Sequence, residues 1–87
     1  MGLDSVELVM AWEMAFGLVF SNADARRLST VGDVVDFVVE RLLREGRPRA
    51  RAEVFELVCA ITRQECGVPR DVMLTDATRF IEDLGID

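Results

Sequence analysis

Apolar positions recur at helical spacing near the start of the chain. Between residues 6 and 16 only Glu7 and Glu13 interrupt the apolar side chains, which predicts a helix more apolar than an ordinary half-exposed one. The predicted core-facing stripe consists of Leu8, Trp12, Ala15 and Phe16. The other side would hold Glu7, Met10, Glu13 and Met14. Methionine beside carboxylate favours either contact with a partner or a second buried edge, and both interpretations stay open.

Three further segments carry helix signals. Residues 22–28 suit one or two short helical turns. Thr30, with an aspartate three residues later, forms an approximate capping box for a helix that Gly46 would end. The helical pattern returns at residues 54–62 and stops at Gly67. We therefore expect an all-α fold, a bundle of three longer helices and one short helix in a single domain.

Two segments lack the helical pattern. Residues 46–51 form an Arg/Pro linker, in which Gly46 and Pro48 oppose helix formation and three arginines favour contact with solvent. Residues 68–87 lose the periodicity, although Thr75–Thr78 can form a single turn. A loop of this length in so small a domain is usually functional.

Charge and hydropathy exclude several classes of function. The chain has sixteen acidic and ten basic residues, and its net charge of −6 argues against nucleic-acid binding. Basic protein surfaces are the expected partners. The sequence has no run of eighteen apolar residues, and its opening lacks the basic region of a signal peptide. We expect a cytoplasmic protein without a membrane span.

Few catalytic or metal-binding groups are available. The chain has no histidine, so the usual zinc site, Cys-His dyad and Ser-His-Asp triad cannot be built. Cys59 and Cys66 lie in one predicted helix, which would hold their α-carbons about 10 Å apart, too far for a disulfide. We expect no enzyme, no catalytic residues, no metal site and two buried thiols.

A serine at the head of the first predicted helix resembles the attachment site of acyl carrier proteins. It stands in the sequence Asp4-Ser5-Val6-Glu7-Leu8-Val9-Met10-Ala11. Residues 23–25 and 29–38 are similar to the family's third and fourth helices, and residues 54–66 and 67–87 to its first helix and first loop. Nearly the whole chain except the arginine linker is covered by this resemblance. One departure is that the family commonly has about one more helical turn between its serine and the Val-Glu-Leu run.

The order of the segments differs from the family's, in which the first helix and loop precede the serine. The chain therefore resembles a circularly permuted carrier, one domain over 1–87. It would hold family helices 2 to 4 in 1–45, the linker in 46–51, and helix 1 with the long first loop in 52–87. The tail Gly85-Ile86-Asp87 is similar in sequence to Gly2-Leu3-Asp4, as expected if two tandem copies were cut again at their junction. Six extended residues reach about 20 Å, enough to join neighbouring helices.

The resemblance implies specific chemistry at Ser5. A separate phosphopantetheinyl transferase, with magnesium and coenzyme A, would attach a 4′-phosphopantetheine arm there. The arm would carry acyl groups as thioesters for fatty acid or polyketide-type biosynthesis. Acyl-transferring and synthase enzymes with basic docking patches would recognise Asp4, Val6, Glu7, Met10 and Glu13. An acyl pocket near Ile61 and Phe80 is implied by the family alone.

Other interpretations stay open. A helical adaptor could keep the carrier fold without ever being modified, because the permutation places both chain ends beside Ser5, where a transferase must bind. Ser5 would then be a plain helix cap. We expect a monomer, with a dimer formed by exchange of the tail between two copies as the other state.

Overall fold

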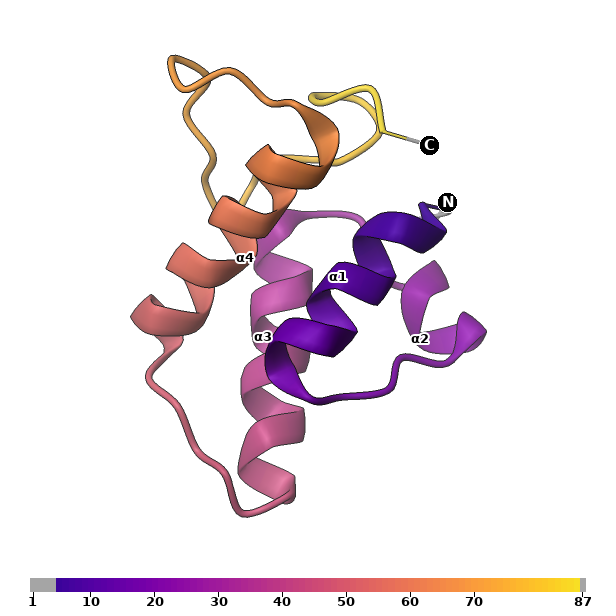
Figure 1. The fold of residues 1–87 in the computed structure, drawn as a ribbon, viewed down its shortest axis with the longest axis vertical. Coiled ribbons are helices and arrows are strands. Elements are labelled where there is room, and N and C mark those ends of the chain that lie inside the picture. Colours follow the sequence, from indigo (N-terminus) through magenta and orange to yellow (C-terminus); the bar gives the residue numbers. More distant parts are fainter. Residues whose placement is uncertain (1–4, 87) are drawn as a thin grey trace.

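A computed structural model describes residues 5–86, which form four helices (Figure 1). These are α1 (Val6–Phe16), α2 (Asn22–Arg26), α3 (Val31–Arg44) and α4 (Arg51–Cys66). Helix α4 packs against both α3 and α1. The predicted all-α bundle of three longer helices and one short helix is confirmed.

Several helix ends lie where the sequence places them, although α2 ends at Arg26, before residue 28, and α3 ends at Arg44, before Gly46. Ser5 is the N-cap of α1, and its Oγ accepts a hydrogen bond from the Leu8 N–H at 3.4 Å. Gly17 ends α1 with φ of 64°, a left-handed conformation that a glycine adopts without steric cost. Thr30 and Asp33 form the predicted capping box of α3, since each side chain accepts a hydrogen bond from the other residue's backbone N–H at 3.1 Å.

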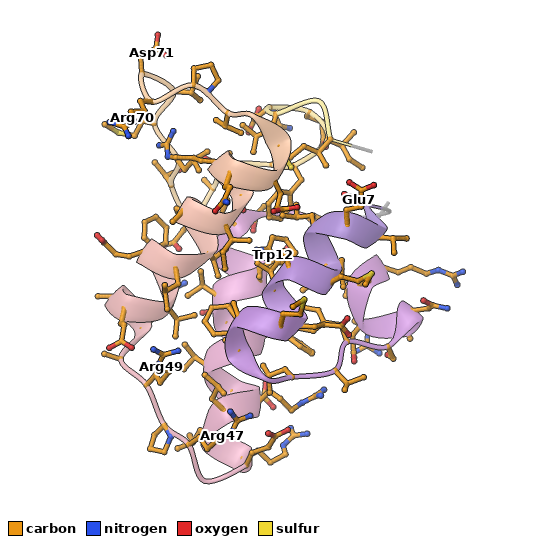
Figure 2. The ribbon with its side chains drawn as sticks, viewed as in Figure 1. Glu7, Trp12, Arg47, Arg49, Arg70 and Asp71 are labelled. Atoms are coloured by element: carbon orange, nitrogen blue, oxygen red, sulfur yellow. The ribbon has the colours of Figure 1, made fainter. Side chains whose placement is uncertain are left out.

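One apolar core lies between α1, α3 and α4. Trp12 is fully buried in it (Figure 2). The centroid of its ring lies 5.6 Å from that of Phe80 and 6.3 Å from that of Phe20. Leu8 and Phe16 are buried on the same face of α1 as predicted. The prediction that Ala15 shares this face is wrong, because Ala15 is exposed. The buried residues Leu8, Trp12 and Phe16 recur at every fourth position. Ala15 precedes Phe16 by one residue, so its side chain is rotated by about 100° away from this face.

The tail after α4 folds over the start of α3. The first backbone N–H groups of a helix have no acceptor within the helix. Here the tail supplies carbonyl acceptors for two of these groups. Val31 N–H donates to the Thr78 carbonyl, and Gly32 N–H donates to the Asp76 carbonyl, each at 2.9 Å. Thr30 also forms an isolated antiparallel bridge with Arg79. These bonds fix the tail against the bundle.

The close approach at Gly32 leads to a stability prediction. A Cβ at this position would lie 2.9 Å from the Asp76 carbonyl oxygen, which belongs to backbone and cannot easily move. Gly32→Ala gains up to about 1 kcal/mol of helix propensity, but overpacking costs about 1–3 kcal/mol. We expect a net destabilisation of roughly 1–2 kcal/mol in urea unfolding. Equal or greater stability of the variant would contradict this contact.

The arginine linker is exposed, as predicted, but it also binds the end of α1, a helix that it does not connect. Helix α4 begins at Arg51, so the connector spans residues 45–50. The Arg47 guanidinium donates to the carbonyl oxygens of Phe16 and Gly17, both at 3.1 Å, and so caps the end of α1. Long-range contacts of this kind have no local sequence signal. The last turn of α1 contains no basic residue, and Arg47 supplies the positive charge at the negative end of the helix dipole.

Candidate functional site

Ser5 lies at the start of α1 with its side chain partly exposed. Among the described residues, its hydroxyl accepts one hydrogen bond, from Leu8 N–H, which is long at 3.4 Å and therefore weak. The unpaired N–H groups of the first helical turn and the positive end of the helix dipole lie beside the hydroxyl. A phosphate ester on Oγ would be stabilised by both. The site is therefore compatible with the modification that the sequence predicts.

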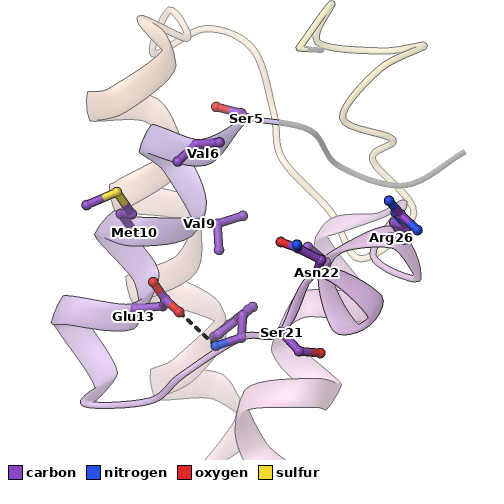
Figure 3. A pocket seen from close by; sticks show the side chains of 10 residues that line it. Ser5, Val6, Val9, Met10, Glu13, Ser21, Asn22 and Arg26 are labelled. Carbon is purple, nitrogen blue, oxygen red and sulfur yellow. Dashed lines mark hydrogen bonds between the residues drawn. The ribbon is translucent and has the colours of Figure 1, made fainter.

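A cavity of about 370 Å³ opens beside Ser5, between α1 and α2 (Figure 3). Its volume lies within the range of small-molecule sites. Its lining is half apolar and half polar: Val6, Val9, Met10, Phe20 and Ala25, with Ser5, Glu13, Ser21, Asn22 and Arg26. The residues contributed by α2 and the segment before it were not predicted as part of the site. Their position depends on where this five-residue helix packs.

Helix α2 is held by a capping box that the sequence analysis missed. The Ser21 hydroxyl accepts a hydrogen bond from Asp24 N–H, and the Asp24 carboxylate accepts one from Ser21 N–H, both at 3.0 Å. The Ser21 backbone N–H is the main cause of a lowered pKa at Asp24. The spacing of serine and aspartate was the available signal. This box orients the α2 wall of the cavity.

The outer face of α1 presents an apolar stripe. Val6, Met10 and Met14 are 68%, 52% and 83% exposed, and they recur at every fourth position. Glu7 is also exposed (Figure 2). The interpretation of this side as a second buried edge is therefore wrong. The expected partner-facing positions of Val6, Glu7 and Met10 are accessible, whereas Asp4 lies outside the described residues.

The Glu13 carboxylate accepts a hydrogen bond within the domain that the sequence did not indicate. It is half-buried, and its Oε2 accepts a hydrogen bond from Phe20 N–H at 2.8 Å (Figure 3). This bond fixes the segment that leads from α1 to α2. A partner that contacts Glu13 would therefore bind a carboxylate that already accepts a hydrogen bond from Phe20 N–H.

The two residues of the expected acyl pocket lie away from the cavity beside Ser5. Phe80 is 1% exposed and packs against Trp12, and Ile61 is half-buried against the core. Neither residue lines the cavity. Their role in holding cargo stays a prediction.

The remaining reactive groups do not form a second site. Cys59 is buried and Cys66 is half-buried, so the prediction of two buried thiols is correct for Cys59 alone; both thiols are free, and burial raises the pKa of each. No cluster of three or more potential metal ligands occurs within residues 5–86. Over the same residues, no helix is long and apolar enough to cross a membrane.

Comparison with known proteins identifies relatives of this chain. No protein-family model and no solved structure matches it. The acyl carrier proteins of Cyanidium caldarium and Thermotoga maritima are each 45% identical over 40 residues, which is 46% of this chain and 46% and 49% of theirs. The acyl carrier protein of Thermosynechococcus vestitus is 53% identical over 36 residues, 41% of this chain and 44% of that protein. The matched segments span about half the length of these relatives. Over about half of its length, this chain is therefore similar in sequence to acyl carrier proteins.

Proposed function

We propose that this chain is an acyl carrier domain in which the Ser5 hydroxyl receives a 4′-phosphopantetheine arm. The observation that carries the proposal is the position of Ser5, partly exposed at the head of α1 and beside a cavity of about 370 Å³. The relationship to acyl carrier proteins supports it. The test is incubation with coenzyme A and a broad-specificity transferase, followed by intact mass measurement.

The residues around Ser5 fit the arm without supplying its chemistry. When bound, the arm supplies a thiol that carries acyl groups as thioesters. The first turn of α1 stabilises the phosphate end through its backbone N–H groups. Among residues 5–86, Glu13 is the one carboxylate that lines the cavity, and its Oε2 accepts the Phe20 N–H. In this proposal a separate transferase with magnesium performs the attachment, and the chain acts as a carrier and not as an enzyme.

The exposed stripe of α1 suits docking by the enzymes that load and use the carrier. Glu7 would attract basic patches at long range, and Val6 and Met10 would supply apolar contact. Such encounters are fast, weak and sensitive to salt, as a shuttle between enzymes requires. The proposed setting is fatty acid or polyketide-type biosynthesis in the cytoplasm.

Charge reversal of Glu7 tests this docking face. We expect Glu7→Lys to slow loading by the transferase about two- to fivefold at low salt, the size of an exposed charge pair, and to lose the effect at high salt. Glu40→Lys is the matched control, because Glu40 is exposed on α3 and the change in net charge is the same. Initial rates from intact mass measure both variants. Equal rates for the two variants at low salt would contradict docking at Glu7.

The described contacts also support the proposal that the domain is circularly permuted. Residues 45–50 join α3 to α4, which would be the last and first helices of the family's order. The tail docks on the start of α3 and places Phe80 against Trp12 of α1. One chain can thus complete the bundle as a monomer. A dimer that exchanges α4 and the tail would use the same contacts between two copies.

A second candidate, an adaptor that is never modified, is favoured by one observation. Ser5 directly precedes the Val-Glu-Leu run and caps α1 through Leu8 N–H, whereas the family commonly has about one more helical turn between its serine and that run. In that case Ser5 would serve the helix alone, and α1 would bind partners without an arm. The same mass measurement separates the two candidates.

A further inference from the structure

The connector of residues 45–50 is the one covalent link between two parts of the chain that share a core. The first part holds α1 to α3, and the second holds α4 and the tail. Val54, Val58 and Phe80 of the second part are fully buried against the first. All of these contacts would be the same if the second part came from another copy of the chain. The core contacts by themselves therefore do not select the monomer.

The backbone of the connector turns at its start. Gly46 has φ of 76°, in the left-handed region, and its N–H donates to the Leu43 carbonyl at 3.1 Å. The N–H of Arg47 donates to the Leu42 carbonyl at 2.8 Å. These two bonds close the end of α3 in the way that a glycine after a helix commonly does. The turn therefore fixes the backbone of Arg47 to the end of α3.

The Arg47 side chain binds the same point of the connector to α1. Its guanidinium donates to the carbonyl oxygens of Phe16 and Gly17, both at 3.1 Å, and pairs with Glu45 at 2.7 Å. A Cβ added at Gly17 would lie 3.3 Å from Nη1 of Arg47, so the guanidinium packs closely on the end of α1. A planar guanidinium can bind two acceptors at once because its donors form a rigid fork. Arg47 therefore links the ends of α1 and α3.

Beyond Arg47 the connector packs loosely. A cavity of about 410 Å³ lies beside it, lined by Ala15, Phe16, Gly17, Leu42, Arg47, Pro48 and Arg49. Residues 48–50 are exposed, and the Arg49 side chain pairs with Glu53 of α4 at 2.7 Å. Among residues 5–86, the hydrogen bonds from the connector to α1 come from the Arg47 side chain. The hold of the connector on α1 therefore depends on Arg47.

We propose that Arg47 decides whether α4 and the tail close on their own chain or on a second copy. With Arg47 bound to α1, only residues 48–50 are free to extend, and three residues reach about 10 Å. That is the spacing of neighbouring helices in one bundle, so α4 packs on its own α3. When Arg47 is released and the turn at Gly46 opens, residues 45–50 reach about 20 Å and can cross to a second copy. Arg47 thus keeps the chain monomeric.

This inference does not rest on the proposed function. Arg47 lies at the end of the bundle opposite to Glu7 and the start of α1 (Figure 2). An exchanged dimer would contain two complete bundles, each with its own Ser5. Attachment at Ser5 is measured separately by mass, so failure of one proposal leaves the other intact.

Refolding from urea at low and at high protein concentration tests the inference, because exchange requires the bundle to open. Size-exclusion chromatography with light scattering measures the fraction of dimer. We expect the wild-type chain to refold as a monomer at both concentrations. Arg47→Ala should raise the equilibrium constant for dimer formation at least about fivefold and give a measurable dimer at the high concentration. The reason is that it removes charge-assisted hydrogen bonds that only the monomer makes.

Two further variants separate these bonds from the charge of the connector. Arg47→Lys keeps the charge at the end of α1, but an ammonium lacks the planar fork that binds both carbonyl oxygens. Its dimer fraction should lie between those of the wild type and Arg47→Ala. Arg49→Ala removes an arginine that pairs with Glu53 on its own helix, so it should stay monomeric. Circular dichroism and thermal melting check that every variant is folded.

A last variant distinguishes exchange from association through an exposed surface. Met10→Glu places a charge in the exposed stripe of α1 and should weaken a dimer formed through that stripe. Added to Arg47→Ala, it should leave the dimer fraction unchanged. The inference is overturned if the wild-type chain dimerises or if Arg47→Ala stays monomeric. It is also overturned if Arg49→Ala dimerises as Arg47→Ala does, or if Met10→Glu removes the dimer.

Discussion

Ser5→Ala should abolish the gain of one phosphopantetheine that we expect the wild-type chain to show with coenzyme A and a broad-specificity transferase. The hydroxyl of Ser5 is the group at the head of α1 that can form the phosphodiester. Ser21→Ala is the matched control, because Ser21 also caps a helix and lines the same cavity. Loss of either cap costs about 1 kcal/mol, so the two variants should be similarly stable. Intact mass and thermal melting are measured on all three chains.

The outcomes of this experiment separate the proposals. A wild-type chain that gains no mass would contradict the carrier role and favour the unmodified adaptor. A gain that persists in Ser5→Ala would remove the assignment to Ser5 but not the carrier role. A loss in Ser21→Ala as well would indicate that the transferase needs α2 in place. In that case the Ser5 result would no longer identify the attachment site.

Phe80→Ala should destabilise the domain by about 3–5 kcal/mol, the cost of removing a buried aromatic side chain. Phe80 is 1% exposed, and its ring lies 5.6 Å from that of Trp12. It fixes the tail to α1 across the core. Since small domains are stable by only about 5–15 kcal/mol, the variant would lie close to unfolding. Urea unfolding followed by Trp12 fluorescence measures the difference.

A control in the same tail tests whether the effect is specific. Met73 is 80% exposed, so Met73→Ala should change the free energy of unfolding by less than about 0.5 kcal/mol. Phe80→Leu keeps most of the volume and should cost less than Phe80→Ala, which covers the case in which the alanine variant does not fold. Equal, small effects of Phe80→Ala and Met73→Ala would show that the tail is not anchored in the core. That result would contradict the proposal that the tail completes the permuted bundle.

Local sequence was sufficient for the existence of the four helices and for three of their caps. The caps at Ser5, Gly17 and Thr30 depend on residues within four positions along the chain, so their signals can be read from neighbouring residues. The burial of Leu8 and Trp12 follows from helical periodicity in the same way, whereas the exposure of Met10 was left open by the sequence. The same residues around Ser5 also carried the resemblance to acyl carrier proteins.

Only the tertiary structure decided the surroundings of those helices. Arg47 caps α1 from thirty-one residues away, and Glu13 binds the backbone that leads into α2. The cavity beside Ser5, and the place of Arg26 in it, depend on where a short helix packs. The amino-acid sequence alone determined the periodic faces and caps, because those interactions are local. Packing between distant segments decided the cavity and the long-range bonds, because such contacts leave no periodic pattern in the chain.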